Sequence, residues 1–161
     1  MNRVITIALV LATTACQYDP FAHEFTTKRP SEEQLIGRCA PDLQAGAIGS
    51  NLNVMVSPTC ELTLRPDHTF MAKALPRCWF PPTNTDCLPG TSDVEGHWTL
   101  REDGKWWAVN LNADLPPGGV SKTWNVPAIV RGAKPPYILH LTIGDPDSGN
   151  ALALVAQAPR A

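Results

Sequence analysis

The feature that most restricts the fold of this chain is an alternation of apolar and polar residues with a period of two. Leu62 and Leu64 alternate with polar neighbours, and the same pattern returns at 97–101, 106–111 and 137–143. Successive side chains of a β-strand point to opposite faces, so this period predicts strands that are buried on one face. No window of 11 or more residues shows a helical face. The chain is therefore predicted to be all-β.

Turn-forming residues lie between these segments and predict antiparallel hairpins. Residues 66–69 contain Pro-Asp, and residues 102–105 contain Asp-Gly, which is a strong hairpin signal between alternating segments. Residues 144–149 form another turn before a strand at 151–155. Consecutive hairpins favour an antiparallel meander, in the form of a sandwich or an up-and-down barrel.

Weaker strand patterns lie at 35–40, 52–56 and 120–130. Pro127 predicts that the last of these is an edge strand or a loop, because proline donates no ladder hydrogen bond. Residues 76–93 are rich in Pro, Thr, Asn and Asp, which predicts a surface excursion between two strands.

The N-terminus is predicted to be an export signal. Arg3 is followed by an apolar run at 4–12, which is too short to cross a bilayer as a helix but fits a signal peptide. Small residues then precede Cys16, and this resembles the lipobox of bacterial lipoproteins, with Thr13 where that family usually has leucine. The resemblance implies cleavage before Cys16 and acylation of that cysteine. The alternative is an ordinary cleaved signal.

The predicted organisation is a signal peptide over 1–15, a lipidated tether over 16–34 and a β-barrel-like domain over 35–161. The tether is polar and has no sustained period. The resemblance implies a lipid-anchored protein of the cell envelope. Gln17 stands where an aspartate tends to retain Gram-negative lipoproteins at the inner membrane, so the outer membrane is expected if the host is Gram-negative.

Composition excludes several other classes. The chain has 16 prolines and 11 glycines in 161 residues, which is below the share typical of disorder, and its hydrophobic fraction of 43% fits a globular protein. A collagen, a coiled coil and a multi-span membrane protein are excluded as well. A net charge of −2 gives no reason to expect a nucleic-acid partner.

A family resemblance rests on residues 35–39, 62–70 and 96–100. Together they resemble the G-x-[WY] … L-x-L-x-x-D-G-T-F … G-x-W pattern of small lipocalin-like β proteins and bacterial lipoproteins. The sequence GDPDSG at 144–149 narrows the resemblance to a group of uncharacterised bacterial lipoproteins. It implies a small lipocalin-like barrel, closed or half-open, and transfers no catalytic residue.

Two residues depart from that pattern. Cys39 stands where an aromatic residue is usual, which suggests that a disulfide replaces a packed ring. His68 stands where glycine is usual, which predicts a non-glycine residue at a positive φ.

The chain has five cysteines, and assigning Cys16 to the lipid leaves Cys39, Cys60, Cys78 and Cys87. An even number in an exported domain predicts two disulfides, and four cysteines allow three connectivities. The pairs 39–60 and 78–87 are favoured. A zinc site is the rival, but the close C-x₂₋₄-C spacing of zinc sites is absent.

Aromatic residues supply the candidate binding patch. Trp79 and Phe80 lie in the long excursion, and Trp106 falls on the face opposite the predicted core, where Trp98 and Trp107 are expected. Such aromatics mark recognition surfaces, or else the loop folds over the barrel end and buries them.

No catalytic residue, metal site or cofactor is predicted. G-x-S-x-G is missing, and the turn at 144–149 lacks the carboxylate and helix of an EF-hand. His97 and His140 are expected on the polar faces of their strands. The predicted function is therefore a membrane-anchored, non-catalytic interaction module for a protein or envelope component. The alternative is a carrier or sensor that binds a small apolar ligand in a lipocalin-like cavity.

Overall fold

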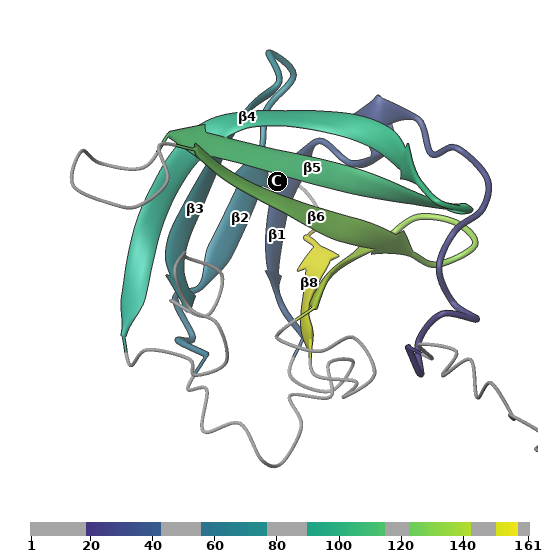
Figure 1. Cartoon of the computed structure of the whole chain (residues 1–161). Helices are drawn as coiled ribbons and strands as arrows, with labels where there is room; N and C mark the ends of the chain where they lie inside the picture. Colours follow the sequence, from purple (N-terminus) through teal and green to yellow (C-terminus); the bar gives the residue numbers. More distant parts are fainter. Residues whose placement is uncertain (1–18, 43–55, 77–89, 115–122, 143–150, 158–161) are drawn as a thin grey trace, which may run out of the picture.

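A computed structural model describes residues 19–42, 56–76, 90–114, 123–142 and 151–157. Eight antiparallel strands follow one another in chain order, and the last pairs with the first, so the sheet closes into a barrel (Figure 1). The strands are β1 (Gly37–Pro41), β2 (Glu61–Leu64), β3 (Thr69–Pro76), β4 (Thr91–Asp103), β5 (Trp106–Asp114), β6 (Thr123–Arg131), β7 (Ile138–Thr142) and β8 (Ala151–Ala156).

The predicted all-β, antiparallel meander is confirmed, and the barrel is closed rather than half-open. The helical structure among these residues is one 3₁₀ turn, η1 (Glu32–Gln34), in which the Gln34 side chain accepts a hydrogen bond from the Ser31 N–H. No helix in the described part of the chain is long and apolar enough to span a bilayer.

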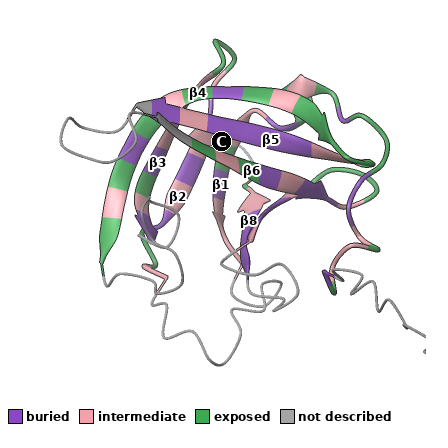
Figure 2. Cartoon of the chain, in the orientation of Figure 1, coloured by how far each residue is buried: buried purple, intermediate pink, exposed green. Residues whose placement is uncertain are grey.

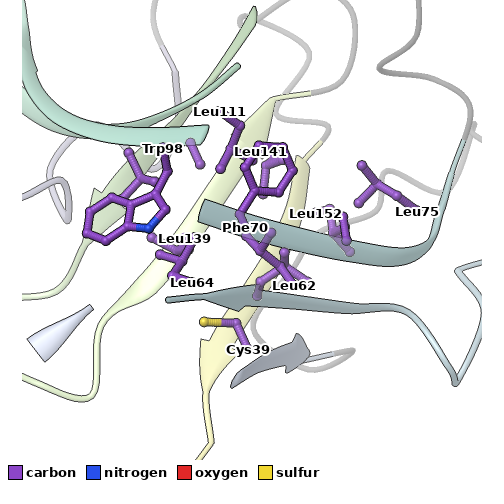
Figure 3. Close-up of a cluster of buried hydrophobic side chains, with 14 of the residues drawn as sticks. Cys39, Leu62, Leu64, Phe70, Leu75, Trp98, Leu111, Leu139, Leu141 and Leu152 are labelled. Atoms are coloured by element: carbon purple, nitrogen blue, oxygen red, sulfur yellow. The ribbon is translucent and has the colours of Figure 1, made fainter. Parts of the chain in front are cut away.

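The apolar residues of the alternating pattern face the inside of the barrel, and their polar neighbours face the outside. Leu62 is paired with Ala72 in β3, and Trp98 with Leu111 in β5, so apolar residues of neighbouring strands share the inner face. Figure 2 shows the resulting stripes of burial, and Figure 3 shows side chains from several strands meeting in one core. The largest fully buried side chains are Trp98, Phe70, Leu62, Leu64, Leu75, Leu111, Leu139, Leu141, Leu152, Leu154 and His140.

The turn between β2 and β3 closes one end of the core. His68 has φ 64°, which confirms the predicted positive φ at this position. The Asp67 carboxylate accepts the Thr69 N–H at 3.0 Å, and the Trp98 indole N–H donates to the Arg65 carbonyl at 3.0 Å. The turn is thereby fixed to the core beneath it.

A β-bulge changes which residues of β3 point inward. The register shifts between Ala72 and Leu75, and Ala74 takes φ 49°. The Asp93 carboxylate accepts the Ala74 N–H at 2.8 Å. Leu75 is therefore buried, although simple alternation would place Ala74 on the inner face instead.

Two strand predictions were wrong. Residues 120–130 were expected to be an edge strand or a loop, but β6 pairs with β5 on one side and β7 on the other. Pro127 is tolerated because β7 pairs only with residues 129–131 of β6. The strand β4 begins at Thr91, within the segment predicted to be a surface excursion. The weak strand predicted at 52–56 lies outside the described residues, apart from Val56.

Candidate functional site

Several predicted site residues lie outside the described part of the chain. They are the lipidation site, two cysteines and two aromatic residues of the candidate patch: Cys16, Cys78, Cys87, Trp79 and Phe80. The turn at 144–149 lies outside it as well.

Cys39 and Cys60 are both buried, and both are free cysteines in the structure, which shows no 39–60 disulfide. The strand register gives the reason. Cys39 is paired with Leu62, which places Cys60 diagonally across the ladder rather than opposite. Diagonal neighbours are ~7–8 Å apart, whereas a disulfide needs a Cα–Cα distance of ~4.4–6.8 Å. Burial raises the pKa of Cys39 to about 12 and, with the Glu61 charge, that of Cys60 to about 11.

Trp106 is half-buried, because a phenylalanine from the N-terminal part of the chain covers it. The ring of Phe25 meets Trp106 edge-on, with 5.0 Å between centroids, and the Lys105 ammonium lies 5.1 Å from the Trp106 ring. Trp107, which was expected in the core, is also only half-buried, with the Arg29 guanidinium 5.3 Å from its ring.

The contact of Phe25 with the barrel belongs to a longer docked segment, residues 19–26. Phe25 is 5% exposed and forms an isolated antiparallel bridge with Arg131 of β6. The Thr26 N–H donates to the Val130 carbonyl at 2.9 Å, and the Thr26 carbonyl accepts the Trp107 N–H at 3.1 Å. These residues belong to the range 16–34 that was predicted to be a tether, and within that range residues 19–26 lie against the barrel.

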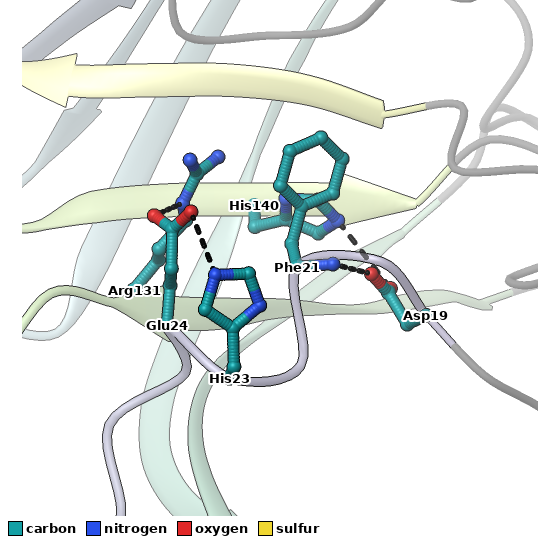
Figure 4. A network of polar contacts seen from close by, with 6 residues as sticks. All are labelled: Asp19, Phe21, His23, Glu24, Arg131 and His140. Carbon is teal, nitrogen blue, oxygen red and sulfur yellow. Dashed lines mark hydrogen bonds and ion pairs between the residues drawn. The ribbon is translucent and has the colours of Figure 1, made fainter.

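Beneath the docked segment lies His140, on the outer face of β7. The sequence predicted a polar surface position, but His140 is only 1% exposed, because Phe21 and Phe25 cover it with their ring centroids 5.1 Å from the imidazole. His140 Nε2 lies 3.7 Å from Asp19 Oδ2, and Asp19 Oδ1 accepts the Phe21 N–H at 2.8 Å (Figure 4). His140 Nδ1 is buried and has no hydrogen-bond partner among the described residues.

A second ionic contact holds the same segment to β6. Arg131 Nε donates to Glu24 Oε2 at 2.5 Å, and the Arg131 guanidinium lies 4.5 Å from the Phe21 ring (Figure 4). The hydrogen bond from Arg131 lowers the pKa of Glu24. The pKa of His140 is lowered because burial outweighs the attraction of the Asp19 carboxylate. His140 is therefore neutral near pH 7, and the contacts of the cluster hold the segment on the barrel.

No sequence pattern predicted this cluster. The segment has no strand period, and its acidic and basic partners are distant along the chain: Glu24 and Arg131 are 107 residues apart. Two phenylalanines in an otherwise polar stretch, Phe21 and Phe25, are the one signal that could have indicated docking. His97, which was predicted to lie on the polar face of its strand, is exposed on β4 and does not join the cluster.

Comparison with known proteins found no match. No family model matches the chain, and no curated protein or solved structure matches it either.

Proposed function

We propose that this chain is an envelope lipoprotein, anchored through acyl chains on Cys16, whose barrel is a non-catalytic interaction module. The proposal combines the lipobox-like sequence before Cys16 with the packing of the barrel. It includes the outer membrane as the location if the host is Gram-negative. The partner is a protein or another component of the envelope.

The filled interior of the barrel is the observation that carries the choice of function. Barrels of eight strands are just wide enough to be filled by side chains or to hold one small ligand. Here the inner face contributes bulky groups that are fully buried, including Trp98, Phe70 and Leu111. Their packing favours the interaction module over the carrier, because a carrier would have to displace them to admit an apolar ligand.

The buried histidine supports a non-catalytic role. A general acid or base must reach the substrate within hydrogen-bond distance. His140 and Asp19 are instead covered by the docked segment and held beside the Phe21 and Phe25 rings. Their contact therefore serves to hold the segment on the barrel.

A disulfide between Cys78 and Cys87 stays within the proposal. An exported domain meets an oxidising environment, and these two cysteines are near each other in the sequence. This bridge would close a local loop between β3 and β4. It does not depend on Cys39 and Cys60, which are free thiols in the barrel core.

The test compares the full chain with Cys16→Ser in a bacterial host given labelled palmitate. We expect the wild-type chain to incorporate the label and to sediment with membranes, and Cys16→Ser to do neither. Labelled Cys16→Ser protein in the membrane fraction would contradict the anchor. Uptake of a lipophilic fluorescent probe that survives washing, with quenching of tryptophan emission, would contradict the filled interior and favour the carrier.

A further inference from the structure

Five polar residues form one continuous row across the outer face of the barrel, on the opposite side of the sheet from the core. The register pairs Thr69 with His97, His97 with Asn112, and Asn112 with Asn125, so the row crosses β3, β4, β5 and β6. Arg65 extends it, because its N–H donates to the Thr69 carbonyl at 2.9 Å. Neighbouring strands are ~4.8 Å apart, so the row is roughly 19 Å long.

A pocket of about 530 Å³ opens along this polar row, which is defined as Arg65, Thr69, His97, Asn112 and Asn125. All five side chains line the pocket. The remaining described lining residues are Phe70, Glu95, Gly96 and Ala113. A Cβ on Gly96 would lie 2.1 Å from the Asn112 carbonyl oxygen, so β4 and β5 come unusually close at this point.

The amide groups in the row are held in place before any ligand binds. Asn112 Oδ1 accepts hydrogen bonds from Asn125 Nδ2 at 2.8 Å and from Asn110 Nδ2 at 3.3 Å. Asn110 lies two residues from Asn112 on the same face and is 4% exposed, and its Oδ1 has no hydrogen-bond partner within the described residues. Groups that are fixed in advance lose little conformational entropy on binding. The row therefore presents oriented donors and acceptors.

The charges of the pocket favour an uncharged ligand. Arg65 brings one positive charge and Glu95 one negative charge, and the other polar lining groups are two amides, a hydroxyl and an imidazole. Amides and hydroxyls both donate and accept, which matches ligand hydroxyl and acetamido groups. Phe70 and Ala113 also border the pocket, but both are buried on the inner face, so the polar groups form the surface that a ligand would meet.

We propose that the polar row binds an uncharged saccharide chain carrying hydroxyl and acetamido groups. This inference rests on the proposed function, since it names the class of partner that the interaction module recognises. The affinity for a short chain is weak, because no aromatic ring stands exposed among the described lining residues to stack on a sugar. A polymer would bind more strongly, because many membrane-anchored copies can engage it at once.

The test is an NMR titration of the full chain with the tetrasaccharide of N-acetylglucosamine. We expect the side-chain amide signals of Asn112 and Asn125 to shift with a dissociation constant of about 1 mM. The variants Asn125→Ala and His97→Ala each weaken binding by roughly three- to tenfold, as expected for one lost hydrogen bond. Arg101→Ala is the matched control, because Arg101 is also exposed on the outer face of β4 but lies outside the row, and it leaves binding unchanged.

Three outcomes would overturn the saccharide site. The first is that the tetrasaccharide produces no shifts at concentrations above 10 times the expected dissociation constant. The second is that inorganic phosphate shifts the same signals instead, which would indicate an anion site at Arg65 and His97. The third is that the tetrasaccharide shifts the signals of Leu139 and Leu141 instead, which would indicate a ligand inside the barrel. Palmitate incorporation at Cys16 is measured separately, so failure of the saccharide site is distinguishable from failure of the anchor.

Discussion

At the scale of single residues, the His140 imidazole is shielded from solvent. It is 1% exposed, and its Nδ1 has no partner in the described part of the chain. The charged groups that face it are Asp19 and Glu24, which favour its protonation, and Arg131, which opposes it. Burial is the largest effect, so the pKa of His140 in the folded protein lies below its usual 6.5.

This lowered pKa predicts a loss of stability in mild acid. Well above pH 6.5 the histidine is neutral in the folded and unfolded states and contributes no pH dependence. Below pH 6.5 the unfolded chain binds a proton that the folded chain does not, so the free energy of unfolding falls, by up to about 1.4 kcal/mol per pH unit. The loss stops once the pH is below the folded pKa. Urea unfolding at pH 7.5, 6.5, 5.5 and 4.5 measures this loss of unfolding free energy. Differences smaller than about 0.3 kcal/mol are not interpreted.

The matched variants are His140→Gln and His97→Gln. Replacing the buried histidine removes its part of the slope of the unfolding free energy against pH, and His97→Gln is the same substitution at an exposed histidine. Equal slopes for the wild type and His140→Gln would contradict the lowered pKa.

The thiols of Cys39 and Cys60 make the second residue-scale prediction. Thiolates are the reactive form, and the pKa values of about 12 and about 11 leave very little thiolate at pH 8. We expect iodoacetamide to label neither cysteine in the folded protein and both in urea without a reductant, as read by peptide mass spectrometry. Cys78 and Cys87, if bridged, are labelled only after reduction. Labelling of Cys39 and Cys60 that also requires a reductant would contradict the free thiols.

At the scale of elements, the close contact of β4 and β5 depends on one glycine. A methyl group at residue 96 would overlap the Asn112 carbonyl, whereas residue 104 has open space and only a positive φ of 65°. We expect Gly96→Ala to lower the free energy of unfolding by about 3 kcal/mol, near the upper end of the usual cost of overpacking. Gly104→Ala should cost about 1 kcal/mol through backbone strain alone. Chemical denaturation of both variants measures the difference, and equal losses would contradict a steric requirement at Gly96.

The elements also show where sequence reasoning succeeded. Strands with one face in water, such as β2 and β4, have a clear period of two, because water and core favour opposite residue types at alternate positions. The period fails at Ala74, where the bulge depends on the distant Asp93 carboxylate. At Pro127 the sequence predicted an edge strand or a loop. A proline is tolerated there because the partner strand β7 does not extend to residue 127. Both outcomes are decided by a neighbour in space, which a local pattern does not contain.

At the scale of the whole molecule, the N-terminal segment sets the distance between the barrel and the proposed lipid anchor. His140 was predicted to be a surface residue because only its own strand was considered, yet residues 19–26 cover it. The candidate site therefore arises from contacts between the first and last parts of the domain. The same docking changes the distance between the barrel and the proposed lipid on Cys16.

A tether of 19 residues over 16–34 could hold the barrel up to ~60 Å from the bilayer. With the chain docked from Asp19 onward, only three residues, 16–18, separate the anchor from the barrel, and they span at most ~11 Å. The lipidated protein is therefore expected to lie against the lipid headgroups, with the docked segment facing the membrane.

Vesicles with nitroxide-labelled headgroups test this arrangement. The amide signals of Phe21 and His23 in the lipidated protein should broaden strongly. Phe25→Ala removes the ring that packs on Trp106 and His140, so the segment should detach, the broadening of barrel amides should decrease, and the Thr26 and Trp107 amides should exchange faster with solvent. Thr27→Ala, a change at an exposed residue directly after the segment, should alter neither. Barrel amides that broaden equally in wild type and Phe25→Ala would show that docking does not set the distance of the barrel from the membrane.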